Sequence, residues 1–79
     1  MELDLLKKIV SEVMKVDPNE LKNDTTFIDD LGADSLDVFR IIMNMEEQFQ
    51  IVIPRDVIYD IQTLDDAYSL IKNNKRHNM

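Results

Sequence analysis

The fold is decided by one stretch that leads from a loop into the longest apolar-periodic segment of the chain: Leu31-Gly32-Ala33-Asp34-Ser35-Leu36-Asp37. Gly32 is the only glycine among the 79 residues, and Ser35 follows it by three positions. Glycine gives the backbone freedom ahead of a helix, and serine is a common residue at a helix start. N–H groups at that start lack intrahelical partners and attract negative charge. The position therefore suits a phosphoester on Ser35, although position alone favours a plain N-cap serine.

Residues 35–50 carry two apolar stripes when they are placed on a helical wheel of about 100° per residue. The first stripe spans about 100°, the width expected of a core-facing surface; its members are Val38, Ile41, Ile42, Met45 and Phe49. Outside that arc lies a second stripe edged by acidic residues: Leu36, Phe39 and Met43, with Glu46 and Glu47 around them. Either the long loop covers this second stripe, or it is an exposed docking surface.

The rest of the chain predicts three further helices. Apolar residues at helical spacing indicate a first helix over 3–16, and Asp17-Pro18 predicts at most a short turn after it. Pro54 is expected to open a short helix over 55–61, and a capping-box-like start at Thr63 opens the last helix, which should end near 73–74. The fold class is therefore all-α, a small four-helix bundle with three longer helices and one short one.

The loop between the first two helices is long for so small a domain. Three of its apolar residues are expected to hold it against the core: Phe27, Ile28 and Leu31. The domain is expected to span residues 1–74, followed by a frayed tail over 75–79.

Composition limits the functional classes. The net charge is −7, and residues 29–66 contain ten acidic residues against Arg40 and Arg55. Nucleic acid is therefore excluded as a partner, whereas basic protein surfaces would be attracted. The chain has no cysteine, no apolar run near the ~18 residues of a membrane span, and no basic secretory start. We expect a soluble, cytoplasmic monomer that does not bind membranes.

The motif around Ser35 resembles the prosthetic-group attachment site of acyl carrier proteins of the bacterial fatty-acid-synthesis type. The resemblance rests on Asp34-Ser35-Leu36, preceded by Leu31-Gly32-Ala33 and followed by Asp37. Two further segments are similar to the flanks of that motif in the family: Phe27-Ile28-Asp29-Asp30-Leu31 before it, and Glu46-Glu47-Gln48-Phe49 with Ile53-Pro54 after it. The similarity covers nearly the whole chain apart from its last few residues.

The resemblance implies a non-catalytic carrier with no metal. A separate synthase would transfer 4′-phosphopantetheine from coenzyme A to Ser35, with Asp34 and Leu36 beside the attachment point, and acyl groups would travel as thioesters on the arm. Fatty acid synthesis enzymes with basic docking surfaces would bind the helix after Ser35. The implied docking residues are Leu36, Asp37, Phe39, Arg40, Met43, Glu46, Glu47 and Asp56. The implied acyl pocket is formed by Leu6, Val10, Ile41, Ile42, Met45 and Phe49.

Other classes fit the residues less well. A serine hydrolase lacks the Gly-x-Ser-x-Gly pattern, and its only histidine would be His77, in the expected tail. A calcium module lacks the EF-hand spacing of acids. A helical adaptor without a prosthetic group stays open, as does a specialised carrier of a polyketide, aminoacyl or other dedicated pathway. Arg40 and Arg55 depart from the fatty-acid carrier pattern, because the family commonly has acidic residues at these positions, and this weakens the argument for docking to its usual partners.

Overall fold

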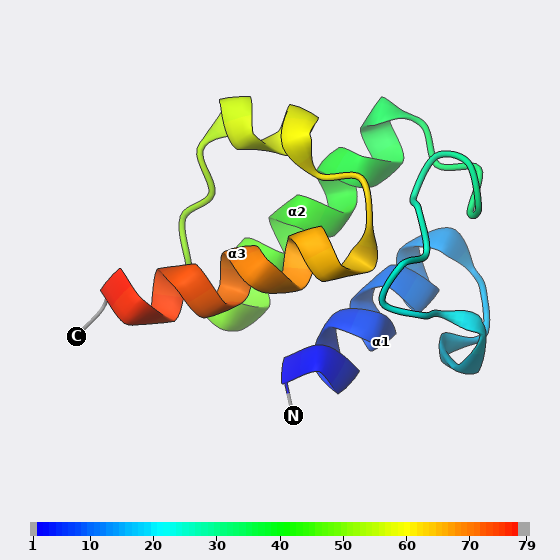
Figure 1. The fold of residues 1–79 in the computed structure, drawn as a ribbon, viewed down its shortest axis with the longest axis horizontal. Helices are drawn as coiled ribbons and strands as arrows, with labels where there is room; N and C mark the ends of the chain where they lie inside the picture. Colours follow the sequence, from blue (N-terminus) through cyan, green and yellow to red (C-terminus); the bar gives the residue numbers. More distant parts are fainter. Residues whose placement is uncertain (1, 78–79) are drawn as a thin grey trace.

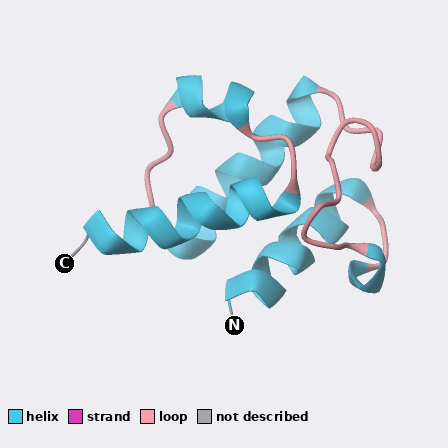
Figure 2. Ribbon diagram, in the orientation of Figure 1, coloured by secondary structure: helices cyan, strands magenta, loops and turns pink. Residues whose placement is uncertain are grey.

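The computed structural model describes residues 2–77 and shows an all-helical arrangement, with no strand in that range (Figure 1 and Figure 2). The elements in chain order are α1 (Glu2–Met14), η1 (Pro18–Glu20), α2 (Ser35–Phe49), η2 (Arg55–Asp60) and α3 (Leu64–His77). α1 contacts both α2 and α3, while η2 contacts α2. The predicted bundle of three longer helices and one short one is confirmed, with η2 as the short helix and a long loop between α1 and α2.

Two helices end at residues in the left-handed conformation. Lys15 has a φ of 58°, and α1 ends just before it, two residues earlier than the sequence predicts. The N–H of Val16 then donates to the carbonyl of Ser11 at 3.1 Å, the closing bond of a Schellman-type end. Gln50 ends α2 in the same conformation, with a φ of 54°. Neither position has the glycine that usually marks such an end.

Hydrogen bonds fasten the long loop to the start of α3. Thr26 and Thr63 form an isolated antiparallel bridge. Three backbone bonds of 2.9–3.0 Å join the two segments, from the N–H groups of Phe27, Leu64 and Asp65 to the carbonyls of Gln62, Thr25 and Asn23, respectively. Two of these bonds satisfy N–H groups of the first turn of α3, which have no partner within the helix. The loop therefore also helps to cap α3.

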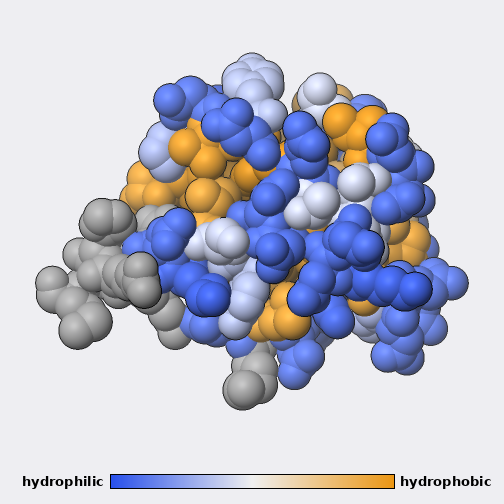
Figure 3. Space-filling view, viewed as in Figure 1, coloured by the Kyte–Doolittle hydropathy of each residue, from blue (hydrophilic) through white to orange (hydrophobic). Residues whose placement is uncertain are grey.

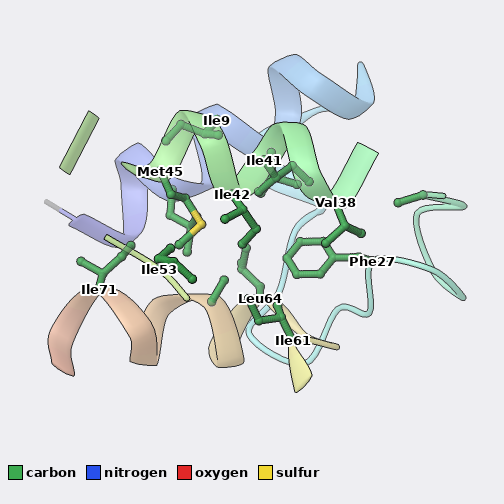
Figure 4. Close-up of a cluster of buried hydrophobic side chains, with 14 of the residues drawn as sticks. Ile9, Phe27, Val38, Ile41, Ile42, Met45, Ile53, Ile61, Leu64 and Ile71 are labelled. Carbon is green, nitrogen blue, oxygen red and sulfur yellow. The ribbon is translucent and has the colours of Figure 1, made fainter. Parts of the chain in front are cut away.

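The core lies among the three α-helices and includes Phe27 and Leu21 from the segment between α1 and α2; Phe27 is seen in Figure 4. Its largest fully buried members are Leu6, Val10, Phe27, Ile41, Ile42, Met45, Leu64 and Ile71. Phe27 thus anchors the loop as predicted, and Leu31 is half-buried. The expectation for Ile28 is wrong, because this side chain is 66% exposed.

The last two helices differ from the predicted ones in type or length. η2 is a 3₁₀ helix and ends at Asp60. The backbone of α3 is helical through His77, so its predicted end near 73–74 was too early. The predicted tail over 75–79 therefore begins inside this helix, and residues 78–79 lie outside the described residues. No helix within 2–77 is both long and apolar enough to cross a membrane.

Candidate functional site

Ser35 is the first residue of α2, and its neighbour Asp34 caps the helix. The Asp34 Oδ1 atom accepts a hydrogen bond from the N–H of Asp37 at 2.9 Å, and the Asp37 Oδ2 atom accepts one from the N–H of Asp34 at 3.3 Å. This reciprocal arrangement is a capping box with aspartate at both positions. The alternative in which Ser35 itself caps α2 is therefore wrong, and its hydroxyl has no structural task there.

The Ser35 hydroxyl is open to reaction. The residue is exposed, and among residues 2–73, whose side chains the structure describes, no hydrogen bond of its hydroxyl is found. Gly32 approaches the site with a φ of 70°, and its N–H donates to the carbonyl of Ile28 at 3.0 Å. A Cβ atom at Gly32 would meet nothing within 4 Å, so the glycine is needed for its left-handed backbone and not for space.

A groove of about 420 Å³ opens beside Ser35 between the first half of α2 and η2. Its walls are formed by Ile28, Ser35, Leu36, Val38, Phe39, Arg55, Ile58, Tyr59 and Ile61. Most of these side chains are apolar, and Arg55 is the one formally charged residue among them. In Figure 1, η2 (yellow) lies above the middle of the view and α2 (green) behind α3, and the two elements are in contact. Ile28 is exposed because its side chain forms part of the wall of this open groove.

The two apolar stripes of α2 differ in burial, as the helical wheel predicts. Val38, Ile41, Ile42 and Met45 are buried and Phe49 is half-buried. In the second stripe, Leu36 is 65% exposed and Met43 51% exposed, while Phe39 is half-buried. The loop thus leaves most of the second stripe uncovered. Hydrophilic side chains cover much of the face seen in Figure 3, with an apolar patch between η2 and α3.

The charged residues predicted for docking divide into exposed and structural ones. Arg40, Glu47 and Asp56 are exposed. Glu46 is half-buried, and its carboxylate accepts a hydrogen bond from the N–H of Ile53 at 2.9 Å, which holds the connection after α2 against the helix. Asp37 is half-buried and belongs to the capping box. The structural use of Glu46 was missed from the sequence, because its partner lies seven residues away outside the helix.

The predicted acyl-pocket residues lie in the core and not in the groove. Five of the six are buried and Phe49 is half-buried. None of the six is among the residues that line the groove beside Ser35. Their role in holding an acyl chain stays a prediction, and it requires the helices to move apart.

Among the described residues, no group of three or more histidine, cysteine, aspartate or glutamate side chains is placed to hold a metal ion. The structure therefore defines a small all-helical domain with an exposed serine at the start of a helix, next to a mainly apolar groove.

Known proteins agree with this class. Residues 4–71 match the family described as "Phosphopantetheine attachment site". The chain is 47% identical over 70 residues to an acyl carrier protein of Sulfurovum sp. (strain NBC37-1), covering 89% of this chain and 93% of that protein. It is 43% identical over 72 residues to one of Wolinella succinogenes, covering 91% and 95%.

A solved structure shows the same fold. An acyl carrier protein structure from Mycobacterium tuberculosis superposes with a TM-score of 0.82 at 26% identity, covering 87% of this chain and 92% of that one. The chain belongs to the acyl carrier protein family. It is a non-catalytic carrier with a phosphopantetheine attachment domain.

Proposed function

We propose that Ser35 is the residue that receives 4′-phosphopantetheine, and that the protein presents acyl groups on this arm to enzymes of fatty acid biosynthesis in the cytoplasm. One observation carries the assignment: Ser35 is exposed, and its hydroxyl makes no hydrogen bond to a side chain or backbone group of residues 2–73, beside a groove of about 420 Å³. Ser11 is buried, and its hydroxyl donates to the carbonyl of Lys8 at 2.8 Å. Ser69 donates to the carbonyl of Asp65 at 3.0 Å, within α3.

The residues around Ser35 fit the group. When bound, the arm supplies a terminal thiol that forms thioesters with acyl groups. Ser35 and Leu36 are the first two residues of α2, so their N–H groups lack intrahelical partners and lie at the helix start, next to the attached phosphate. The groove gives the arm an apolar wall to lie against. The protein thus positions and shelters the arm and takes no part in bond making on the acyl group.

Intact-mass measurement after incubation with coenzyme A and a carrier-protein synthase tests the assignment. The wild type should gain one phosphopantetheine, and Ser35→Ala should gain none. Ser69→Ala is the matched control, since it removes the hydroxyl of another exposed serine, and it should be modified like the wild type. Modification of Ser35→Ala, or failure of the wild type to be modified, would refute the proposal; the second result favours the adaptor without a prosthetic group.

We further propose that the second stripe of α2, formed by Leu36, Phe39 and Met43, is the docking surface for these enzymes. Its support is an apolar strip beside the attachment residue, with Met43 51% exposed. Glu47 and Asp56 are exposed as well, so basic partner surfaces would find complementary charge. Flexible methionine side chains suit several partners in turn.

Substitution of two methionines in the same helix distinguishes an effect on docking from an effect on stability. Met43→Ala should lower synthase turnover at limiting carrier concentration, with a change in unfolding free energy of less than about 1 kcal/mol. Met45 is fully buried, so Met45→Ala should lower the unfolding free energy by about 2–5 kcal/mol. At temperatures where both variants are folded, the Met45 variant should be turned over faster than the Met43 variant. Unchanged turnover of Met43→Ala would contradict the docking surface.

A further inference from the structure

Arg55 is the feature of the groove that the carrier function leaves unexplained. It is the first residue of η2 and the one formally charged side chain that lines the groove shared with Ser35. The rest of the wall is mainly apolar, so a lone cation there is unusual. An arginine in such a position is well suited to bind an anion that enters the groove.

The Arg55 side chain is exposed and contacts one aromatic ring, and its donors are unused. The guanidinium carbon lies 5.5 Å from the centroid of the Phe39 ring, in a cation–π contact that joins η2 to α2. Among the side chains of residues 2–73, Arg55 has no ion-pair partner, and its own side chain makes no hydrogen bond there. A cation–π contact attracts the guanidinium as a charge, and the group carries five N–H donors that can bind an anion. Phe39 therefore positions Arg55 without using its hydrogen-bonding capacity.

The base of the prosthetic arm brings an anion to this place. The arm is joined to the serine through a phosphodiester, which carries one negative charge. Asp34 and Asp37 lie on either side of Ser35 along the chain and repel that charge, apart from what the helix start offsets. Among the residues that line the groove, only Arg55 can supply an opposite formal charge.

We propose that Arg55 binds the phosphodiester of the arm on Ser35 and so holds the base of the arm against the groove, with Phe39 as its positioning residue. This inference rests on the proposed attachment at Ser35. The cation at the start of η2 then serves the arm itself, whatever acyl group the arm carries.

The test compares the unmodified and the modified protein, both without an acyl group, so that the arm is the only added anion. Four forms are needed: the wild type, Arg55→Gln, Arg55→Lys and Arg40→Gln. Arg40 is the matched control, because it is exposed, carries the same charge and does not line the groove. Intact mass first confirms that each form is fully modified. The melting temperature and the ³¹P chemical shift of the phosphodiester are then measured at low salt.

Modification should raise the melting temperature of the wild type more than that of a variant without Arg55. For Arg55→Gln we expect the change in melting temperature on modification to be about 2–8 °C less favourable than in the wild type. Its ³¹P signal should also move, Arg55→Lys should fall between the two, and Arg40→Gln should match the wild type. Equal changes for all four forms, or equal effects of Arg55→Gln and Arg40→Gln, would overturn the role of Arg55. Absence of any modification would instead refute the attachment at Ser35.

Discussion

Removal of the Asp34 carboxylate should destabilise the domain by about 1 kcal/mol, because it removes the N-cap of α2. The N–H of Asp37 would lose its acceptor at 2.9 Å, and the start of the helix would lose a negative charge next to its dipole. A domain of this size rarely has more than ~3–5 kcal/mol of stability, so the loss is a large fraction of the total. In thermal unfolding it corresponds to a melting temperature about 4–8 °C lower for Asp34→Ala.

Two further variants separate the hydrogen bond from the charge. Asp34→Asn keeps a side-chain oxygen and loses only the charge, so it should cost about 0.3–1 kcal/mol. Asp29→Ala removes an exposed carboxylate of the same loop that accepts no side-chain hydrogen bond within residues 2–77, and should stay within about 0.5 kcal/mol of the wild type. Urea unfolding measures all three. Equal stability of Asp34→Ala and Asp29→Ala would refute the capping argument.

Three further predictions follow from charge. The pKa of Asp66 is lowered by hydrogen bonds from the N–H groups of Gln62 and Thr63. The ionised carboxylate should therefore stabilise the fold above the ordinary pKa of aspartate, near 3.9, and this stabilisation should be lost as the pH falls through the lower pKa of the folded state. Asp66→Asn should make the unfolding free energy depend less on pH in this acidic range, and parallel pH profiles of the variant and the wild type would refute the prediction. The ten acidic residues of 29–66 should make the melting temperature rise with salt, and more steeply with magnesium, whereas a flat response would contradict net repulsion. Arg40→Glu should leave stability within about 0.5 kcal/mol and speed association with fatty acid synthesis enzymes at low salt; unchanged or slower association would favour the specialised carrier.

Local signals in the sequence account for most of the architecture. The wheel of residues 35–50 separates buried from exposed side chains, since helical periodicity and burial follow from the same 100° step. The start of α3 at Thr63 was also predictable, because the residues that cap it are adjacent in sequence: the N–H of Asp66 donates to the Thr63 Oγ1 atom at 3.1 Å. Helix ends were less predictable. Lys15 and Gln50 adopt a left-handed conformation that carries no signal in residues of their type.

The site was predictable only in part, because its walls come from distant segments. The attachment residue was found from a local motif. The groove depends on how η2 meets α2, and so neither the exposure of Ile28 nor the position of Arg55 over Phe39 could be foreseen from spacing. Capping also needed geometry, since Asp34 and Ser35 are both good N-cap residues and only the backbone shows which of them caps.

Peptide mapping after modification tests the central claim most directly. Cleavage after lysine and arginine places the three serines in three different peptides: Ser11 in 9–15, Ser35 in 23–40 and Ser69 in 56–72. After treatment with coenzyme A and the synthase, the mass of one phosphopantetheine should appear only on peptide 23–40, and fragmentation should place it on Ser35 and not on Thr25 or Thr26. A modified 9–15 or 56–72 peptide, or a group located on either threonine, would contradict the assignment.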